Sequence, residues 1–188
     1  MKTPPAPEPA MTAAPTIETA RLRLRGFRTS DIDDLAAMLA DKEVVRYVED
    51  GQPKDRSVAE KAVAGIIAHW DREGFGRWAI EERASGEFVG FGGLRSLFGT
   101  PEVVYYVKKD RWGKGYATEL AVAALDFGFN RNGFSRIVAI AKPANERSII
   151  VMKKLGMKFE KLTECYGIDV VQYVISAGEF QQRQLTYG

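Results

Sequence analysis

The fold is decided by the stretch that runs Tyr105-Tyr106-Val107, then five residues, then Gly113-Lys114-Gly115-Tyr116-Ala117-Thr118-Glu119-Leu120. Valine and tyrosine up to residue 107 predict a strand. Apolar residues at Leu120, Ala124 and Phe127 predict a helix. Two glycines lie between the strand and the helix, so the chain turns sharply and enters the helix at once.

This glycine turn is suited to an anion. The first N–H groups of a helix lack intrahelical partners, and they present partial positive charge. Glycines let successive N–H groups point at one ligand, and Lys108, Lys109, Arg111 and Lys114 add positive charge nearby. Spacing alone leaves a plain turn with solvated lysines open. A P-loop is absent, and Thr118 stands where a dinucleotide fingerprint has a small residue.

The rest of the chain alternates strands and helices around this turn. The predicted elements are a strand at 21–27, a helix from 32, a helix from 57, a hairpin at 77–82 and 88–94, a strand at 102–107, a helix at 117–129, a strand at 136–141, a helix from 145, and a hairpin from 159 to 175. Ser57 is predicted to cap the second helix together with Glu60. Hairpins mixed with one strand-helix-strand crossover predict an α+β fold around a single mixed sheet.

Length and composition limit the classes of protein. A chain of 188 residues predicts one domain, with a disordered Pro/Ala-rich tail at 1–16, a folded domain at 17–180 and a C-terminal tail at 181–188. A net charge of +2 gives no broad footprint for nucleic acid or anionic membrane. One cysteine, Cys165, and one histidine favour no metal site. No leader or long apolar run is visible, so we expect a cytoplasmic protein.

Several segments, in order, resemble the GNAT acetyltransferase superfamily, in particular its RimJ/RimL-type branch. The glycine turn and its strand resemble that superfamily's acetyl-CoA motif. The other matching segments are residues 17–25, 145–148, 154–157 and 166–169. The resemblance covers about residues 17–180. It implies a central, mostly antiparallel twisted sheet flanked by about four helices, and acetyl-CoA as the acetyl donor.

The resemblance also implies which residues hold the cofactor. They are Tyr106, Val107, Trp112, Gly113, Lys114, Gly115, Tyr116, Ala117, Thr118, Asn145 and Ser148. Backbone N–H groups from Gly113 to Thr118 would hold the pyrophosphate, and the main chain of Tyr106 and Val107 would pair with the pantetheine arm. Trp112 stands where the superfamily pattern has Gln or Arg, but the backbone cradle does not depend on that side chain.

Transfer of an acetyl group to an amine needs a base, a donor to the thioester carbonyl and a proton for the leaving thiolate. Glu102 is the candidate base, by its place in the resemblance, with a solvated strand-end carboxylate as the alternative. The Val107 N–H is the carbonyl donor by the same analogy. Ser148 or Tyr166 is the candidate proton donor, and a merely packed Tyr166 is the alternative.

The sequence therefore predicts an acetyl-CoA-dependent N-acetyltransferase that acts on a primary amine, either a protein N-terminus or a small molecule. The amine would attack directly in a ternary complex. A catalytically silent acyl-CoA sensor is the competing hypothesis. The resemblance implies that the first two helices and the last hairpin face the acceptor, and these elements carry no readable motif. A monomer or a homodimer is equally compatible with the sequence.

Overall fold

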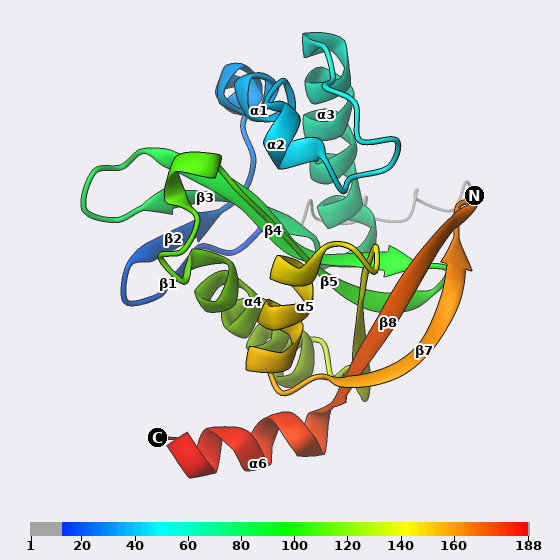
Figure 1. The fold of residues 1–188 in the computed structure, drawn as a ribbon. Coiled ribbons are helices and arrows are strands. Elements are labelled where there is room, and N and C mark those ends of the chain that lie inside the picture. Colours follow the sequence, from blue (N-terminus) through cyan, green and yellow to red (C-terminus); the bar gives the residue numbers. More distant parts are fainter. Residues whose placement is uncertain (1–12, 188) are drawn as a thin grey trace, which may run out of the picture.

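Eight strands form one sheet in the computed structural model, which describes residues 13–187 (Figure 1). Across the sheet the order is β1 (Ile17–Glu18), β2 (Leu22–Arg25), β3 (Arg77–Glu82), β4 (Phe88–Leu97), β5 (Thr100–Val107), β6 (Arg136–Ala141), β8 (Ile168–Ser176) and β7 (Lys158–Cys165). Neighbours pair antiparallel, except that β5 and β6 are parallel. The expected α+β fold with a mostly antiparallel sheet is confirmed.

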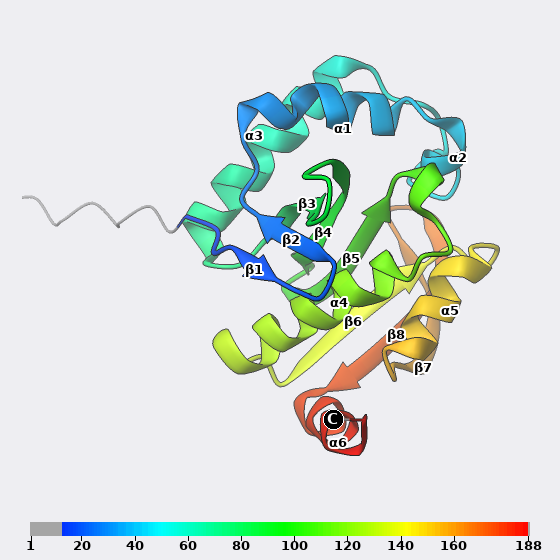
Figure 2. The same cartoon turned by 90° about the vertical axis from the view of Figure 1, so that its left-hand side faces the viewer.

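Helices cover both faces of this sheet. They are α1 (Ile32–Leu39), α2 (Lys42–Val45), α3 (Arg56–Glu73), α4 (Tyr116–Asp126), α5 (Glu146–Lys154) and α6 (Ala177–Tyr187). The group α1–α3 lies on one side of the strands, and α4 and α5 lie on the other (Figures 1 and 2). The four predicted helices correspond to α1, α3, α4 and α5, so the expectation of about four was short by α2 and α6.

Helix α6 occupies most of the range 181–188 that was expected to be a tail. Its start is a reciprocal capping box: the Ser176 N–H donates to the Glu179 carboxylate at 3.0 Å, and the Glu179 N–H donates to Ser176 Oγ at 3.3 Å. Phe180 is buried against Phe129, with ring centroids 5.2 Å apart. The capping and this contact together explain why the chain stays helical past 180.

The start of α3 also differs from the prediction. Asp55 is the N-cap, because its carboxylate accepts the Val58 N–H at 3.2 Å. The Ser57 hydroxyl donates to Asp55, and Glu60 pairs with Arg56 at 3.1 Å instead of closing a capping box. An aspartate two residues earlier offered a stronger acceptor than the serine.

The N-terminal region meets the sheet before β1. Residues 1–12 of the predicted tail lie outside the described part of the chain, and residues 13–16 have no regular structure. The Pro15 carbonyl nevertheless accepts a hydrogen bond from Trp78 Nε1 at 2.8 Å. The end of the predicted tail therefore packs on β3. Within residues 13–187, no helix has both the length and the apolar character needed to cross a bilayer.

Candidate active site

The strands β5 and β6 separate after a single point of pairing. In the described part of the chain, these two strands pair at one position, Glu102 with Val138. Beyond it, the Lys108 N–H donates to Val89 O on β4 at 2.8 Å, which turns the adjacent Val107 main chain toward β6. This leaves an edge of β5 on which an extended ligand can pair as an added strand.

The edge is formed by alternate residues of β5. The Tyr106 carbonyl points at Gly90 of β4, so the Tyr106 main chain belongs to the β4 side. By the same alternation, Tyr105 and Val107 present their main-chain groups to the gap. The sequence had assigned the arm-pairing groups to Tyr106 and Val107. The strand alternation turns the main chains of Tyr105 and Val107 to the gap and that of Tyr106 to β4.

The glycine turn lies directly after this edge. Gly113 and Gly115 have φ values of 76° and 81°, in the left-handed region that favours glycine. Gly115 is the N-cap of α4 and has no side chain to occupy the first N–H groups of the helix. The N–H groups of the following residues Tyr116, Ala117 and Thr118 therefore remain for an anion at the helix N-terminus.

The turn is held from its outer side by Arg21. The Arg21 guanidinium donates to the Lys114 carbonyl at 2.7 Å and pairs with Glu119, also at 2.7 Å. It lies 4.8 Å from the centroid of the Tyr116 ring, and the Tyr116 hydroxyl donates to Glu82. The Tyr116 side chain thus points into the protein, and this residue can contribute only its backbone to a bound phosphate.

Part of the positive charge expected at this turn is already neutralised. Lys108 pairs with Asp34 of α1 at 2.9 Å. Arg111 contacts Glu87, and it lies 3.9 Å from Glu82. The anion site therefore depends mainly on the backbone of the turn, since two of the four expected cations have carboxylate partners.

Trp112 connects the turn to the open edge. Its indole N–H donates to the Val107 carbonyl at 2.7 Å, so this donor serves the protein itself. The Arg147 guanidinium at the start of α5 lies 4.7 Å from the centroid of the indole ring, which is cation–π geometry. This contact brings a cation to the gap that the sequence gave no reason to select.

Asn145 and Ser148 also reach the gap. Asn145 caps α5 by accepting the Ser148 N–H at 3.2 Å, as the predicted helix start requires. Ser148 Oγ lies 3.0 Å from the Tyr105 hydroxyl, which also donates to the Ser148 carbonyl at 3.1 Å. Burial raises the pKa of Tyr105, so its hydroxyl keeps its proton. The pair Tyr105–Ser148 is a hydroxyl relay beside the open edge.

Glu102 lies where β5 and β6 begin to separate, on the sheet face toward α1–α3. Its residue exposure is 2%, and its carboxylate accepts from Arg95 Nε at 2.5 Å. Burial raises the pKa of Glu102, and the Arg95 hydrogen bond and charge oppose that rise. The alternative of a solvated strand-end carboxylate is therefore excluded.

Tyr166 lies apart from the hydroxyl relay. It forms the β7–β8 turn with Gly167, at φ values of 52° and 75°, and it is 71% exposed. Its ring centroid is 5.1 Å from that of Phe98, at the tip of the β4–β5 hairpin. The structure brings Tyr105 rather than Tyr166 to Ser148.

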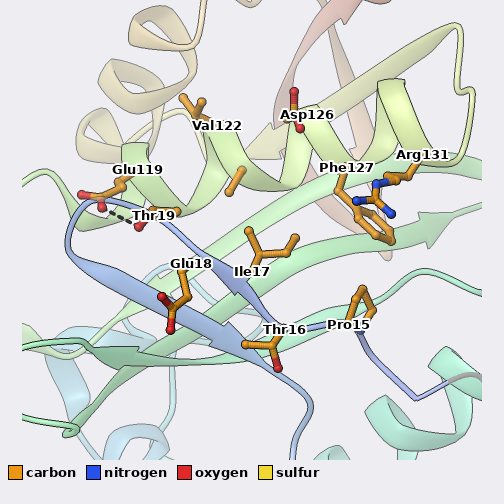
Figure 3. A pocket seen from close by; sticks show the side chains of 11 residues that line it. Pro15, Thr16, Ile17, Glu18, Thr19, Glu119, Val122, Asp126, Phe127 and Arg131 are labelled. Atoms are coloured by element: carbon orange, nitrogen blue, oxygen red, sulfur yellow. Dashed lines mark hydrogen bonds between the residues drawn. The ribbon is translucent and has the colours of Figure 1, made fainter.

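A cavity of about 490 Å³ lies elsewhere, between β1 and α4. Figure 3 shows Ile17 and Phe127 lining it, with the Thr19–Glu119 hydrogen bond at one end. It contains none of the predicted site residues. Across residues 13–187, no three His, Cys, Asp or Glu side chains gather as a metal site would require.

Comparison with known proteins agrees with this geometry. The model of the acetyltransferase (GNAT) domain family matches residues 21–158. The uncharacterized N-acetyltransferase YoaA of Bacillus subtilis is 30% identical over 159 residues, which cover 81% of this chain and 88% of YoaA. The chain belongs to the GNAT acetyltransferase family and is an N-acetyltransferase of that family.

Solved structures give the same fold. A GNAT-family acetyltransferase from Bacillus anthracis superposes with a TM-score of 0.77 at 25% identity, over 87% of this chain and 99% of the other. RimL, a ribosomal L7/L12 alpha-N-protein acetyltransferase solved with coenzyme A, superposes with a TM-score of 0.73 at 18% identity, over 86% and 98%. The second likeness is one of fold alone.

Proposed function

We propose that this protein transfers the acetyl group of acetyl-CoA to a primary amine by direct attack in a ternary complex. One observation supports this most strongly: the open edge at Val107 runs within six residues into the glycine turn at the N-terminus of α4. One site suits an extended amide-bearing arm, and the other suits a pyrophosphate. Coenzyme A joins these two chemical groups in one molecule.

The donor would be held mainly by the main chain. The Tyr105 main chain and the Val107 carbonyl would pair with the pantetheine amides, and N–H groups from Gly113 to Thr118 would hold the pyrophosphate. The Asn145 side-chain amide N–H₂ has no partner within the described residues, and it would donate to the cofactor arm from the N-terminus of α5. Arg147, over the Trp112 ring, adds positive charge on that side.

The reaction forms an N–C bond and breaks the C–S bond of the thioester. The Val107 N–H would donate to the carbonyl oxygen as negative charge develops there. Glu102 would take the proton of the ammonium through a water, since its carboxylate is buried beside Arg95. The thiolate would receive its proton from the Ser148 hydroxyl, which the Tyr105 hydroxyl can resupply.

The first experiment measures acetyl-CoA binding by calorimetry and CoA release with a panel of primary amines. The panel contains peptide N-termini, polyamines, amino acids and aminoglycosides. We expect tight binding of acetyl-CoA and release of CoA with at least one class of amine. Absence of acetyl-CoA binding would refute the proposal. Tight binding without turnover on any amine would favour the acyl-CoA sensor.

A further inference from the structure

The strand register places one arginine beside the candidate base. Arg77 of β3 pairs with Gly93 of β4, which pairs with Val104 of β5. In the rows on either side, Arg95 pairs with Glu102 and Phe91 pairs with Tyr106. Paired residues point to the same face of a sheet. Because Gly93 has no side chain, nothing from β4 separates Arg77 from β5 in its row.

The Arg77 guanidinium is half-buried and has no hydrogen-bond or ion-pair partner anywhere in residues 13–187. Only its main-chain carbonyl is engaged, by Trp70 Nε1 at 2.9 Å. Burial lowers the pKa of Arg77, and the other groups acting on it are Tyr106, Arg95 and Glu102. Its nitrogens keep contact with solvent, since the only buried unpartnered side-chain N and O atoms among the described residues belong to His69 and Asn132, so a ligand can reach them.

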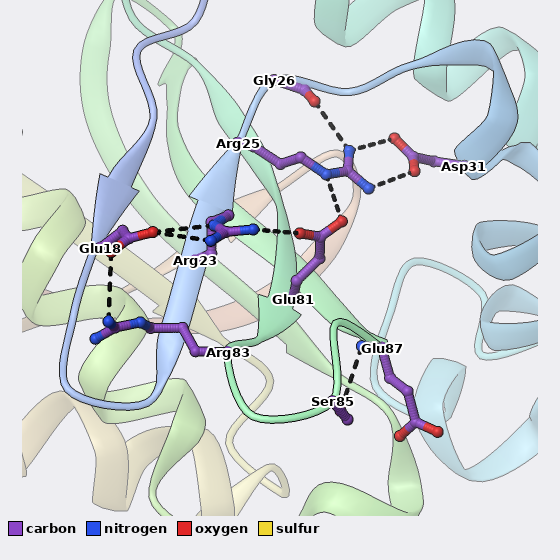
Figure 4. A network of polar contacts seen from close by, with 9 residues as sticks. All are labelled: Glu18, Arg23, Arg25, Gly26, Asp31, Glu81, Arg83, Ser85 and Glu87. Carbon is purple, nitrogen blue, oxygen red and sulfur yellow. Dashed lines mark hydrogen bonds and ion pairs between the residues drawn. The ribbon is translucent and has the colours of Figure 1, made fainter.

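Arg25 shows how the same sheet face treats a structural arginine. Arg25 is in the next row, opposite Ala79. Its guanidinium donates to Asp31 at 2.7 and 2.8 Å, to Glu81 at 2.6 Å and to the Gly26 carbonyl at 3.1 Å (Figure 4). Arg77 has no equivalent of these partners among the described residues, so its donors are open to a ligand.

The hydroxyl of Tyr106 is a second donor at this place. The Tyr106 ring stacks on Phe91 at 4.6 Å, and its hydroxyl makes no hydrogen bond to any described residue. The charges that act on Tyr106 are Arg95, Glu102, Arg77 and Glu49. Glu49 lies in the loop between α2 and α3 and has Lys54 3.6 Å away. Glu102 is matched by Arg95, and Glu49 shares Lys54 with Asp50, which lies closer to it at 2.6 Å. Neither carboxylate is within ion-pair distance of Arg77.

We propose that Arg77 and Tyr106 bind the carboxylate of the acceptor, so that the acceptor is a small amine carrying a carboxylate, as a free amino acid does. This inference rests on the proposed acetyl transfer. A carboxylate would accept from the guanidinium and the phenol together. A polyamine has no carboxylate, so it offers no acceptor to the guanidinium and the phenol together.

The experiment compares three versions of each acceptor: the amino acid, its C-terminal amide and the amine without the carboxyl group. Initial rates of CoA release are measured at saturating acetyl-CoA for wild type, Arg77→Met, Arg77→Lys and Tyr106→Phe. Arg23→Met is the matched control, because Arg23 is on β2 of the same sheet and pairs with Glu18 at 3.0 Å. Calorimetry measures acetyl-CoA binding and amino-acid binding to the CoA complex.

We expect the amino acid to be preferred over its amide and amine by about 10- to 100-fold in kcat/KM, the range of a hydrogen-bonded charge. Arg77→Met should abolish that preference by raising KM, and Arg77→Lys should restore part of it. Tyr106→Phe should weaken it several-fold. Acetyl-CoA affinity should stay at the wild-type value in all four variants.

Equal rates on amino acid and amide in the wild type would overturn this inference and leave the transferase activity standing. So would an unchanged preference in Arg77→Met. If no amine is acetylated, the absence of amino-acid binding to the CoA complex also overturns it, and amino-acid binding that Arg77→Met removes upholds it. Loss of acetyl-CoA binding in the wild type would instead refute the proposed function.

Discussion

The proposed donor half and the proposed acceptor half of the site use different kinds of chemical groups. The donor half uses main-chain groups from residues 105–118, one contiguous stretch, with side chains such as Arg21 holding it from behind. The acceptor half uses side chains of Arg77, Arg95 and Glu102, which the sheet register brings together from three strands. The donor half therefore depends on backbone conformation, above all at its glycines, and the acceptor half depends on the identity of its side chains.

The largest effect should come from placing a side chain inside the donor half. Gly115→Val puts a β-branched residue at a φ of 81°, and its Cβ would lie 3.3 Å from an Arg21 nitrogen. Losing two charge-assisted hydrogen bonds to phosphate predicts about a thousand-fold weaker acetyl-CoA binding by calorimetry. Gly133→Val is the control, since its φ of 67° carries the same strain away from the site. If both variants lose the same acetyl-CoA affinity, the loss is due to lower folding stability and not to the phosphate site.

The ion pair between Arg25 and Asp31 is predicted to affect folding stability, in contrast to Arg77 and Glu102, which are proposed to act in the reaction. Asp31, 4% exposed, begins α1 and binds Arg25. Asp31→Asn removes one of the two carboxylate partners of the buried Arg25 guanidinium and leaves only Glu81, so it should lower the free energy of unfolding by about 3 kcal/mol in urea titrations. Asp33→Asn on the same helix, where the carboxylate is 79% exposed, should change it by less than about 1 kcal/mol.

The same pair predicts a pH dependence of stability. Burial alone would raise the pKa of Asp31, but hydrogen bonds from Arg25 and from the Arg28 N–H lower it below its ordinary value. The contribution is therefore complete above the unfolded pKa of about 3.9 and is lost as pH falls through the lower folded value. Wild type should lose stability below about pH 4 more steeply than Asp31→Asn. Parallel curves would contradict this account.

Glu102→Gln tests the chemistry of the acceptor half. It should lower turnover by about a hundred-fold, the range of general-base catalysis, with acetyl-CoA affinity unchanged. Because burial raises the pKa of Glu102, wild-type turnover should rise with pH through that value, and the variant should lack this rise. Glu160→Gln, at an exposed pair with Arg136, is the control. A pH profile that keeps its shape in Glu102→Gln removes Glu102 as the base.

The two halves also differ in how far the sequence predicted them. Glycines, a strand and a helix at fixed spacing identified the donor turn, because its residues are neighbours in the chain. Arg77 was not selected, because its relation to Glu102 depends on the register across β3, β4 and β5, which the sequence does not state. Gly93 is visible in the sequence as a strand residue without a side chain. That it lies between Arg77 and Val104 is known only from the strand register.

The fold itself was predicted closely where patterns are local. All seven predicted strands are present, and the two-residue β1 is additional. Helix α6 was missed although Ser176 and Glu179 have the spacing of a capping box. The role of Tyr166 stays a prediction. Its side chain is exposed and contacts Phe98, and it does not contact Tyr105 or Ser148.

The smallest expected effect tests how the open edge and the glycine turn of the donor half are joined. Trp112→Phe removes the hydrogen bond to the Val107 carbonyl and keeps an aromatic face for Arg147. One such bond contributes about 1 kcal/mol, so acetyl-CoA affinity should fall about five-fold. Trp112→Ala also loses the cation–π contact and should weaken binding further. If Trp112→Phe binds as tightly as wild type, the indole N–H does not position the edge, and the glycine turn alone sets donor affinity.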